Sequence, residues 1–536
     1  SSPFGLVPHT TAMHLARATS VAPIGDGQLE SGAESTEEGS EEHRDDCDGG
    51  PIWPAILAQF LQVCSIAVFA PYVSLVTALA PYAQGPASHC PEGTGCHTAV
   101  SNVTSQGGVA HKGHYQYGVD AATRGMVHGQ DIISTCSAIS SLADLASFAL
   151  HGMLCDRIGV RVVGIIAQSG KIISVGTLFL CAPSEGILSL HTDHVFVWMV
   201  VSSAISGLCG QTRIPVLALV AKRSSTSLRS TNFGKVAAAT GFAFFLGEAM
   251  NIAIAELVGK HELRLPLLLA AVLSIASLLV ICFTWPSHVK VAEPAPWRDA
   301  VPWVSVKRTI LTSTNLMLFG IMFFIDGFGM DMLHSAFMVF ARKLYHFDTE
   351  HCAMFLMLVG VTTPFVMAVI LPGLLSCRGE LFALRFSSVM LLGVFAVLFL
   401  IGLTPYGFLL FLAAPFIPLS HISGPVLLGF ATRELPKDEW GRLTGATMAV
   451  ETCGRLLAPL TAMYVMRRTM DGPWPSALFL VAAVLMLPGV AIAWWVQPKE
   501  VFEKDDENSQ MEFSEDEVVS TTSAVSLGST PAASIS

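Results

Sequence analysis

Long apolar segments, each followed by a short polar one, fill residues 51–498 of the chain. A helix needs about 20 mostly apolar residues to cross a bilayer, and twelve segments reach that length. We therefore predict membrane-spanning helices rather than amphipathic helices on the surface of a soluble protein. The predicted spans are 52–80, 131–154, 160–182, 195–221, 234–257, 265–286, 312–337, 352–375, 384–403, 407–431, 442–466 and 475–496.

Polar segments divide this pattern into parts. Residues 1–50 and 499–536 are acidic and polar, which predicts disordered tails. Residues 287–310 form a hydrophilic, proline-containing linker, so six predicted spans lie on each side of it. The expected architecture is an all-α membrane protein with twelve transmembrane helices in two six-helix pseudo-repeats, residues 51–286 and 311–498.

Matching residues support the repeat. Pro215 and Arg223 recur as Pro425 and Arg433 at an offset of 210 positions, and further matches follow at an offset of 207. Parallel repeats of six helices are a transporter architecture, in which the substrate site lies near the midplane between the repeats.

Charge is scarce in the predicted spans. Only 13% of residues are charged, against about 25% in an average soluble protein. The net charge is −11, yet residues 51–498 hold 26 basic and 22 acidic residues. This composition excludes a soluble enzyme and a secreted disulfide scaffold, and the lack of a basic stripe excludes a nucleic-acid-binding protein.

The loops predict the orientation. With both tails in the cytoplasm, the cytoplasmic loops hold 15 Lys and Arg residues against 8 in the opposite loops, which is the usual bias. The long loop 83–130 is then extracytoplasmic, and it carries Cys90, Cys96 and a glycosylation sequon at Asn102. We predict a Cys90–Cys96 disulfide and glycosylation there, with zinc binding by these cysteines and neighbouring histidines as the alternative.

A loop signature lies between the second and third predicted spans. It contains Gly152, Asp156, Arg157, Gly159 and Arg161, and a degenerate copy lies at 373–378. The signature resembles the loop between helices 2 and 3 of the major facilitator superfamily. The resemblance implies alternating access, a conformational role for these five residues, and a central cavity lined by helices 1, 4, 7 and 10. Asp156 is also placed to neutralise the N-terminus of an adjacent helix.

Residues 221–234 are similar, more distantly, to the proton-coupled drug-antiporter branch of that superfamily. The chain departs from this branch at two places. Lys222 stands where the branch has an acid, and Gly247 and Glu248 stand in helix 5 where it has a Gly-Pro and Gly-Gly signature.

Ionisable side chains inside a bilayer are costly, so each one is a candidate for function. Arg213 lies near mid-membrane on helix 4, where its guanidinium can hold a carboxylate with two hydrogen bonds. Pairing with Glu248 or with an aspartate of helix 7 is the alternative. Gln59 and Gln62 of helix 1 and His421 of helix 10 complete the expected substrate-binding set.

Three acids are candidates for proton coupling: Asp326, Asp331 and Glu248. Asp326 and Asp331 enclose two glycines of helix 7, and His334 follows Asp331 by three residues. A carboxylate beside a histidine suits a proton relay, whereas a glycine hinge beside a solvated aspartate is the structural alternative.

Two pairs are expected to be structural. Asp144 and Lys171 lie at nearly equal depth on helices 2 and 3, which favours a buried ion pair over proton coupling. Glu451 and Arg455 lie four residues apart on helix 11 and can satisfy each other.

The expected function is secondary active or facilitative transport of a small organic solute, and Arg213 favours one with a carboxylate, such as an amino acid or an organic acid. The sequence shows no nucleotide-binding loop and no nucleophile–base set, so we expect neither an enzyme nor a cofactor. A monomer in the bilayer is expected, with no nucleic-acid partner. A transporter-like receptor or scaffold that acts through its acidic tails is the alternative.

Overall fold

The computed structural model describes residues 51–83, 135–136, 138–181, 192–209, 211–258, 264–286, 297–347, 349–469 and 472–496. All of them belong to one compact unit, Gly49–Ser536, and their regular structure is entirely helical. In this part of the chain, nine helices are long and apolar enough to cross a membrane. Cys90, Cys96 and Asn102 lie outside the described residues.

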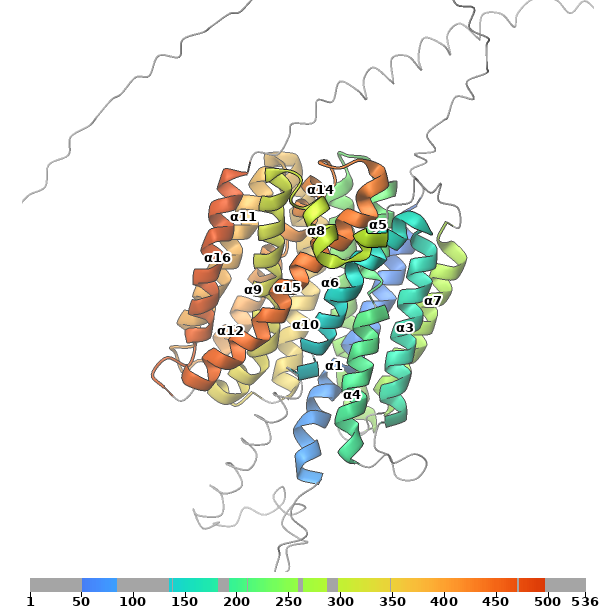
Figure 1. Ribbon diagram of the computed structural model, residues 1–536. Helices are drawn as coiled ribbons and strands as arrows, with labels where there is room; N and C mark the ends of the chain where they lie inside the picture. The colour runs from blue at the N-terminus through green and yellow to red at the C-terminus, as the bar shows by residue number, and fades with distance from the viewer. Residues whose placement is uncertain are drawn as a thin grey trace, which may run out of the picture. The chain divides into compact units, whose positions relative to one another are not determined.

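In the first half of the chain (Figure 1), α1 contacts both α6 and α7, while α3 contacts α4 and α7. Its elements are α1 (Trp53–Ala83), a helix over Ala138–Arg157 that carries no label, α3 (Val160–Cys181), α4 (Thr192–Cys209), α5 (Arg213–Arg223), α6 (Arg229–Val258) and α7 (Arg264–Thr284). Between the halves lie η2 (Trp297–Ala300) and α8 (Pro302–Thr309).

The second half is organised around the pairs α9–α15 and α11–α16. Its elements are α9 (Thr314–Tyr345), α10 (Thr349–Phe365), the π-helical η3 (Val366–Ile370), α11 (Leu371–Ile401), α12 (Phe408–Ala413), η4 (Ala414–Phe416), α13 (Ile417–Ser420), α14 (Ser423–Ala431), η5 (Lys437–Glu439), α15 (Trp440–Thr469) and α16 (Ala477–Trp495).

The two faces of α7 show why the apolar segments pack as they do. One face exposes a stripe of large apolar residues at helical spacing, as a lipid-facing surface does: Leu268, Val272, Ile275, Leu279 and Phe283. The opposite face carries buried serines that bind α1. Ser277 donates a hydrogen bond to the Ala58 carbonyl at 2.9 Å, and the hydroxyls of Ser65 and Ser274 lie 2.9 Å apart. Small polar residues of this kind let membrane helices approach closely.

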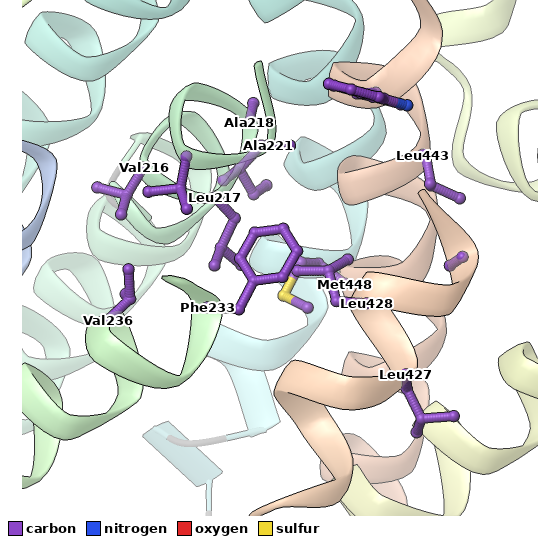
Figure 2. Packing of buried hydrophobic residues seen from close by; sticks show 14 of the residues in the cluster. Val216, Leu217, Ala218, Ala221, Phe233, Val236, Leu427, Leu428, Leu443 and Met448 are labelled. Carbon is purple, nitrogen blue, oxygen red and sulfur yellow. The ribbon is translucent and has the colours of Figure 1, made fainter. Parts of the chain in front are cut away.

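Helices from both halves share one hydrophobic cluster. Figure 2 shows its centre, where α5 and α6 meet α14 and α15. The labelled residues there are Val216, Leu217, Ala218, Ala221, Phe233, Val236, Leu427, Leu428, Leu443 and Met448. The two halves are therefore in direct apolar contact where these four helices meet.

Candidate functional site

Two membrane spans are divided into shorter helices at matching places, while the backbone at Thr212, His421 and Ile422 keeps right-handed helical angles. The predicted span 195–221 is two helices, α4 and α5, and the second begins at Arg213. The predicted span 407–431 is a series of short helices, the last of which, α14, begins at Ser423. These two starts are 210 positions apart, the offset of the sequence repeat. A helix start leaves unpaired N–H groups and a partial positive charge, and transporters use such breaks at the membrane midplane to bind solutes and ions.

At the first break, Arg213 meets a carboxylate of the other half. Its Nη1 lies 3.1 Å from Glu451 Oε1 on α15, and the Arg455 guanidinium, one turn along, binds the same oxygen. The Arg213 and Arg455 side chains keep 36% and 31% of their surface exposed, whereas Thr212 and Ile214 beside Arg213 are fully buried. The two arginine side chains are therefore partly accessible, although the residues beside Arg213 are not.

At the second break, Asp326 of α9 occupies the start of α14. Ser423 Oγ donates a hydrogen bond to Asp326 Oδ1 at 3.1 Å. Both residues, together with Ser388 of α11, line a small cavity of about 20 Å³. That volume holds a single water molecule, and the three side chains supply its polar partners.

Two further ionisable groups of α9 act on the same arginine, Arg455. Asp331 and His334 interact electrostatically with each other and with Arg455. His421, at the break between α13 and α14, interacts with Arg455, His334 and Glu451. Residues predicted separately for solute binding and for proton coupling are thus brought together, which we call the charged cluster: Arg213, Asp326, Asp331, His334, His421, Glu451 and Arg455.

Asp144, on the helix Ala138–Arg157, links that helix to the charged cluster. Gln211, in the break before α5, donates a hydrogen bond from Nε2 to Asp144 Oδ2 at 3.1 Å. The charges of Lys171 and Arg455 both act on Asp144. The expected Asp144–Lys171 ion pair stays a prediction, and Arg455 of the other half is a further charge that acts on Asp144. Gln211 gave no signal in the sequence, because a neutral side chain beside a glycine is common in loops.

The structure does not bring Glu248 to Arg213. Glu248 is 2% exposed on α6, where Asn251 hydrogen-bonds its carboxylate, and no charge of the cluster acts on it among the described residues. Gln59 and Gln62, on α1 against α6, are 6% and 5% exposed.

Asp156 connects the two halves at one end of the unit, which we call the Asp156 end. Its Oδ1 lies 3.0 Å from Lys222 Nζ at the end of α5. Its carboxylate also accepts hydrogen bonds from the backbone N–H groups of Gly441 at 3.1 Å and Arg442 at 2.7 Å. These N–H groups are in the first turn of α15, so Asp156 neutralises a helix N-terminus of the opposite half.

The other signature residues shape the loop around Asp156. Gly159 has a φ of 92°, which lets the chain turn sharply between two helices. Arg157 lies over the Trp297 ring of η2, 4.5 Å from its centroid. Arg161 donates a hydrogen bond to the Cys282 carbonyl at the end of α7.

A second acid connects the halves in the same way. Glu380 follows Gly379, whose φ is 79°, in the loop inside α11. Arg433 binds both Glu380 oxygens at 2.7 Å, and Ser230 Oγ of α6 donates a hydrogen bond to Oε1 at 2.7 Å. The degenerate signature has Cys377 where the first copy has an acid, so sequence reasoning missed Glu380, which lies three residues later.

Among the described residues, no group of three or more His, Cys, Asp and Glu side chains could hold a metal ion.

The sequence profile of the Major Facilitator Superfamily matches residues 55–459. This match covers most of the chain, so the chain belongs to that superfamily. Tetracycline resistance protein, class C, of Escherichia coli is 23% identical over 373 residues, which are 68% of this chain and 88% of that protein.

Solved structures show the same fold. The human organic anion transporter MFSD10 (TETRAN) is similar with a TM-score of 0.61 and 18% identity, over 81% of this chain and 98% of that one. A bacterial homologue of the iron transporter ferroportin is similar with a TM-score of 0.56 and 13% identity, over 83% and 98% of the two chains. The protein is therefore an integral multi-pass membrane transporter of the superfamily and not an enzyme.

Proposed function

We propose that the protein transports a small organic anion with a carboxylate group, and that Arg213 and Arg455 bind this carboxylate. The observation that carries the proposal is their shared contact with Glu451 within the span. A site that already holds one carboxylate between two guanidiniums can accept another in its place. MFSD10, which has the same fold, is an organic anion transporter, and this supports the same class of solute here.

Displacement of Glu451 from Arg213 by a solute carboxylate would couple solute binding to movement of the two halves. Arg213 belongs to the first half and Glu451 to the second, so their contact ties the halves together in the empty protein. A solute carboxylate that takes Arg213 from Glu451 weakens this tie. The loaded protein then rocks more readily than the empty one, which opens the contacts at Asp156 and Glu380 and gives alternating access.

Proton coupling fits the same cluster. Asp326 interacts with Arg213, Arg455 and Glu451, and it borders the water-sized cavity. A solute that binds the arginines reduces the positive charge near Asp326, which favours protonation of that carboxylate. Asp331 with His334 is the second candidate pair for carrying the proton.

The solute-binding part is tested with arginine variants. Arg213→Ala should abolish stabilisation of the protein by phenylacetate or 4-phenylbutyrate, measured as the shift of its unfolding temperature in detergent. Arg213→Lys keeps the charge but loses the planar fork, so affinity should fall about tenfold or more. Arg468→Ala, an exposed arginine stacked on Tyr464, is the matched control and should bind as the wild type does. Full affinity in Arg213→Ala would refute the proposal.

The coupling part is tested with Asp326→Asn in proteoliposomes. Uptake of the bound acid should lose its dependence on a proton gradient, while exchange of internal for external acid continues. Wild-type uptake that ignores the proton gradient would make the protein a facilitator and remove the role of Asp326.

A further inference from the structure

A groove opens between the helix Ala138–Arg157 and α15, on the side of the charged cluster away from Asp156. Its volume is about 430 Å³, within the range that binds drug-sized molecules. On each of the two helices, the lining residues recur every three or four positions, so they lie on one face of that helix. The lining residues are Thr135, Ala138, Ile139, Leu142, Leu456, Leu460, Met463 and Arg467.

The groove exists because the two helices diverge. Toward the Asp156 end their backbones touch: a Cβ on Gly152 would lie 2.5 Å from the Gly441 carbonyl oxygen and 2.8 Å from the Gly445 Cα. Farther along the same pair of helices, the facing residues are large and apolar, yet a cavity separates them. The groove is therefore the opening that contact at the Asp156 end leaves between the halves.

The inner end of the groove lies next to the charged cluster along both helices, although no residue of the cluster is among the lining residues. Leu456 directly follows Arg455, and Leu142 lies two residues before Asp144. The charge of Arg455 acts on Asp144 across the two helices. At 1.5 Å per residue, the α15 wall from Leu456 to Arg467 is about 16 Å long. A molecule in this groove can thus place one end at Arg455 and extend along an apolar wall.

We propose that the groove binds the apolar body of an amphipathic organic anion, whose carboxylate lies at Arg455 and Arg213. This inference rests on the proposed function and narrows its solute class. A small hydrophilic acid would leave the apolar walls unused, whereas an acid with an aromatic or alkyl body removes its own apolar surface and that of the walls from water. Leu142 in the groove wall is 58% exposed, so the groove is also open to the surroundings of the unit, which gives such a solute a route from the lipid phase.

The test is a chain-length series of acids: phenylacetate, 4-phenylbutyrate, 6-phenylhexanoate and 8-phenyloctanoate. Binding to the full chain is measured as the shift of the unfolding temperature in one detergent. Each methylene buried in the groove should raise the affinity of the wild-type protein, up to about fourfold. Leu460→Trp fills the groove from α15 and should flatten this dependence, while phenylacetate still binds.

Leu457→Trp is the matched control. Leu457 is 46% exposed and Leu460 is 45% exposed on the same helix, but only Leu460 lines the groove. The control should therefore keep the wild-type length dependence. Leu142→Trp, which fills the groove from the facing helix, should repeat the effect of Leu460→Trp if the latter protein folds poorly.

The outcomes separate the two proposals. A wild-type protein that binds all four acids equally well would overturn the groove but keep the carboxylate site. The same equality, together with less co-purified lipid in Leu460→Trp, would identify the occupant as a membrane lipid and also overturn the inference. A wild-type protein that binds none of the acids would refute the proposed function and the groove together.

Discussion

Buried charge is the costliest property of individual residues in this protein. Asp144 and Lys171 keep only 8% and 6% of their surface exposed. Nearby opposite charges lower this cost, Arg455 more than Lys171 for Asp144, and removal of one partner of a buried pair costs about 3–5 kcal/mol. Asp144 has further support from Gln211 and Arg455.

The single and double alanine variants of this pair should not be additive. Each single variant should destabilise the protein, because it leaves the remaining buried charge with less compensation. The double variant should unfold at a higher temperature than Asp144→Ala alone. Thermal unfolding in one detergent measures all three. Defects that simply add would show that the two charges do not compensate each other.

Glu451 shows where sequence reasoning about single residues reaches its limit. Its contact with Arg455 follows from a spacing of four residues on a helix, and that contact is present. Its contact with Arg213 joins residues 238 positions apart, and no local spacing rule predicts such a pair. The sequence indicated that Arg213, as a cation within a span, can pair with an acid, but it offered Glu248 or an aspartate of α9, Asp326 or Asp331, as the partner.

At the scale of helices, the two halves are fastened by acids that bind the start of a helix in the other half. Asp156 binds the first turn of α15, and Glu380 binds the first turn of α6. Each acid also holds a cation at the end of α5 or just after α14, Lys222 or Arg433. Hydrogen bonds to charged groups contribute about 1.5–3 kcal/mol each, so both contacts favour closure of the Asp156 end.

If Asp156 and Glu380 hold the same end closed, loss of one acid should weaken the contacts that the other acid makes with the opposite half. Glu380→Ala should speed amide hydrogen exchange in residues 440–445 about tenfold, although Glu380 does not bind that segment. Asp156→Ala should do so directly. Glu439→Ala is the control, because its pair with Arg442 lies within one half and is partly exposed, so little change is expected. Unchanged exchange at 440–445 in Glu380→Ala would mean that the two contacts act independently.

The apolar segments predicted where the membrane helices lie, but they did not predict the interruption before Arg213. The span that contains Arg213 has enough apolar residues to look continuous, and only a glycine and two polar residues, 210–212, mark its interruption. The boundary between the predicted spans 352–375 and 384–403 differs, because the polar segment 376–380 marked it in the sequence and the turn at Gly379 inside α11 lies there. Pro364 gave a clearer signal, and a π-helical segment follows it.

For the molecule as a whole, the crossing at Gly152 sets how closely the halves can approach. The neighbours of a Cβ at this position are backbone atoms of Gly441 and Gly445, which can move only if α15 itself moves. Overpacking of this kind costs about 1–3 kcal/mol. That cost falls only on the arrangement in which the Asp156 end is closed.

Gly152→Ala should therefore shift the population of states rather than unfold the protein. The closed Asp156 end should lose population about 5- to 150-fold. Spin labels at positions 227 and 438, one in each half, should report longer distances in a background without native cysteines. Gly176→Ala is the control, because a Cβ at Gly176 meets nothing within 4 Å. The same distance distribution in both variants would rule out Gly152 as a limit on closure.

The carboxylate of Glu451 also decides what the carrier does when no solute is available. Two bare guanidiniums would make reorientation of the unloaded protein costly, since charge without a counter-ion is expensive within a bilayer. Such a carrier could return only with cargo and would run as an obligatory exchanger. Glu451 occupies the arginines in the unloaded form, so the empty carrier keeps its counter-ion and can return by itself. Net flux down a gradient, without a counter-solute on the other side, is then the expected mode of operation.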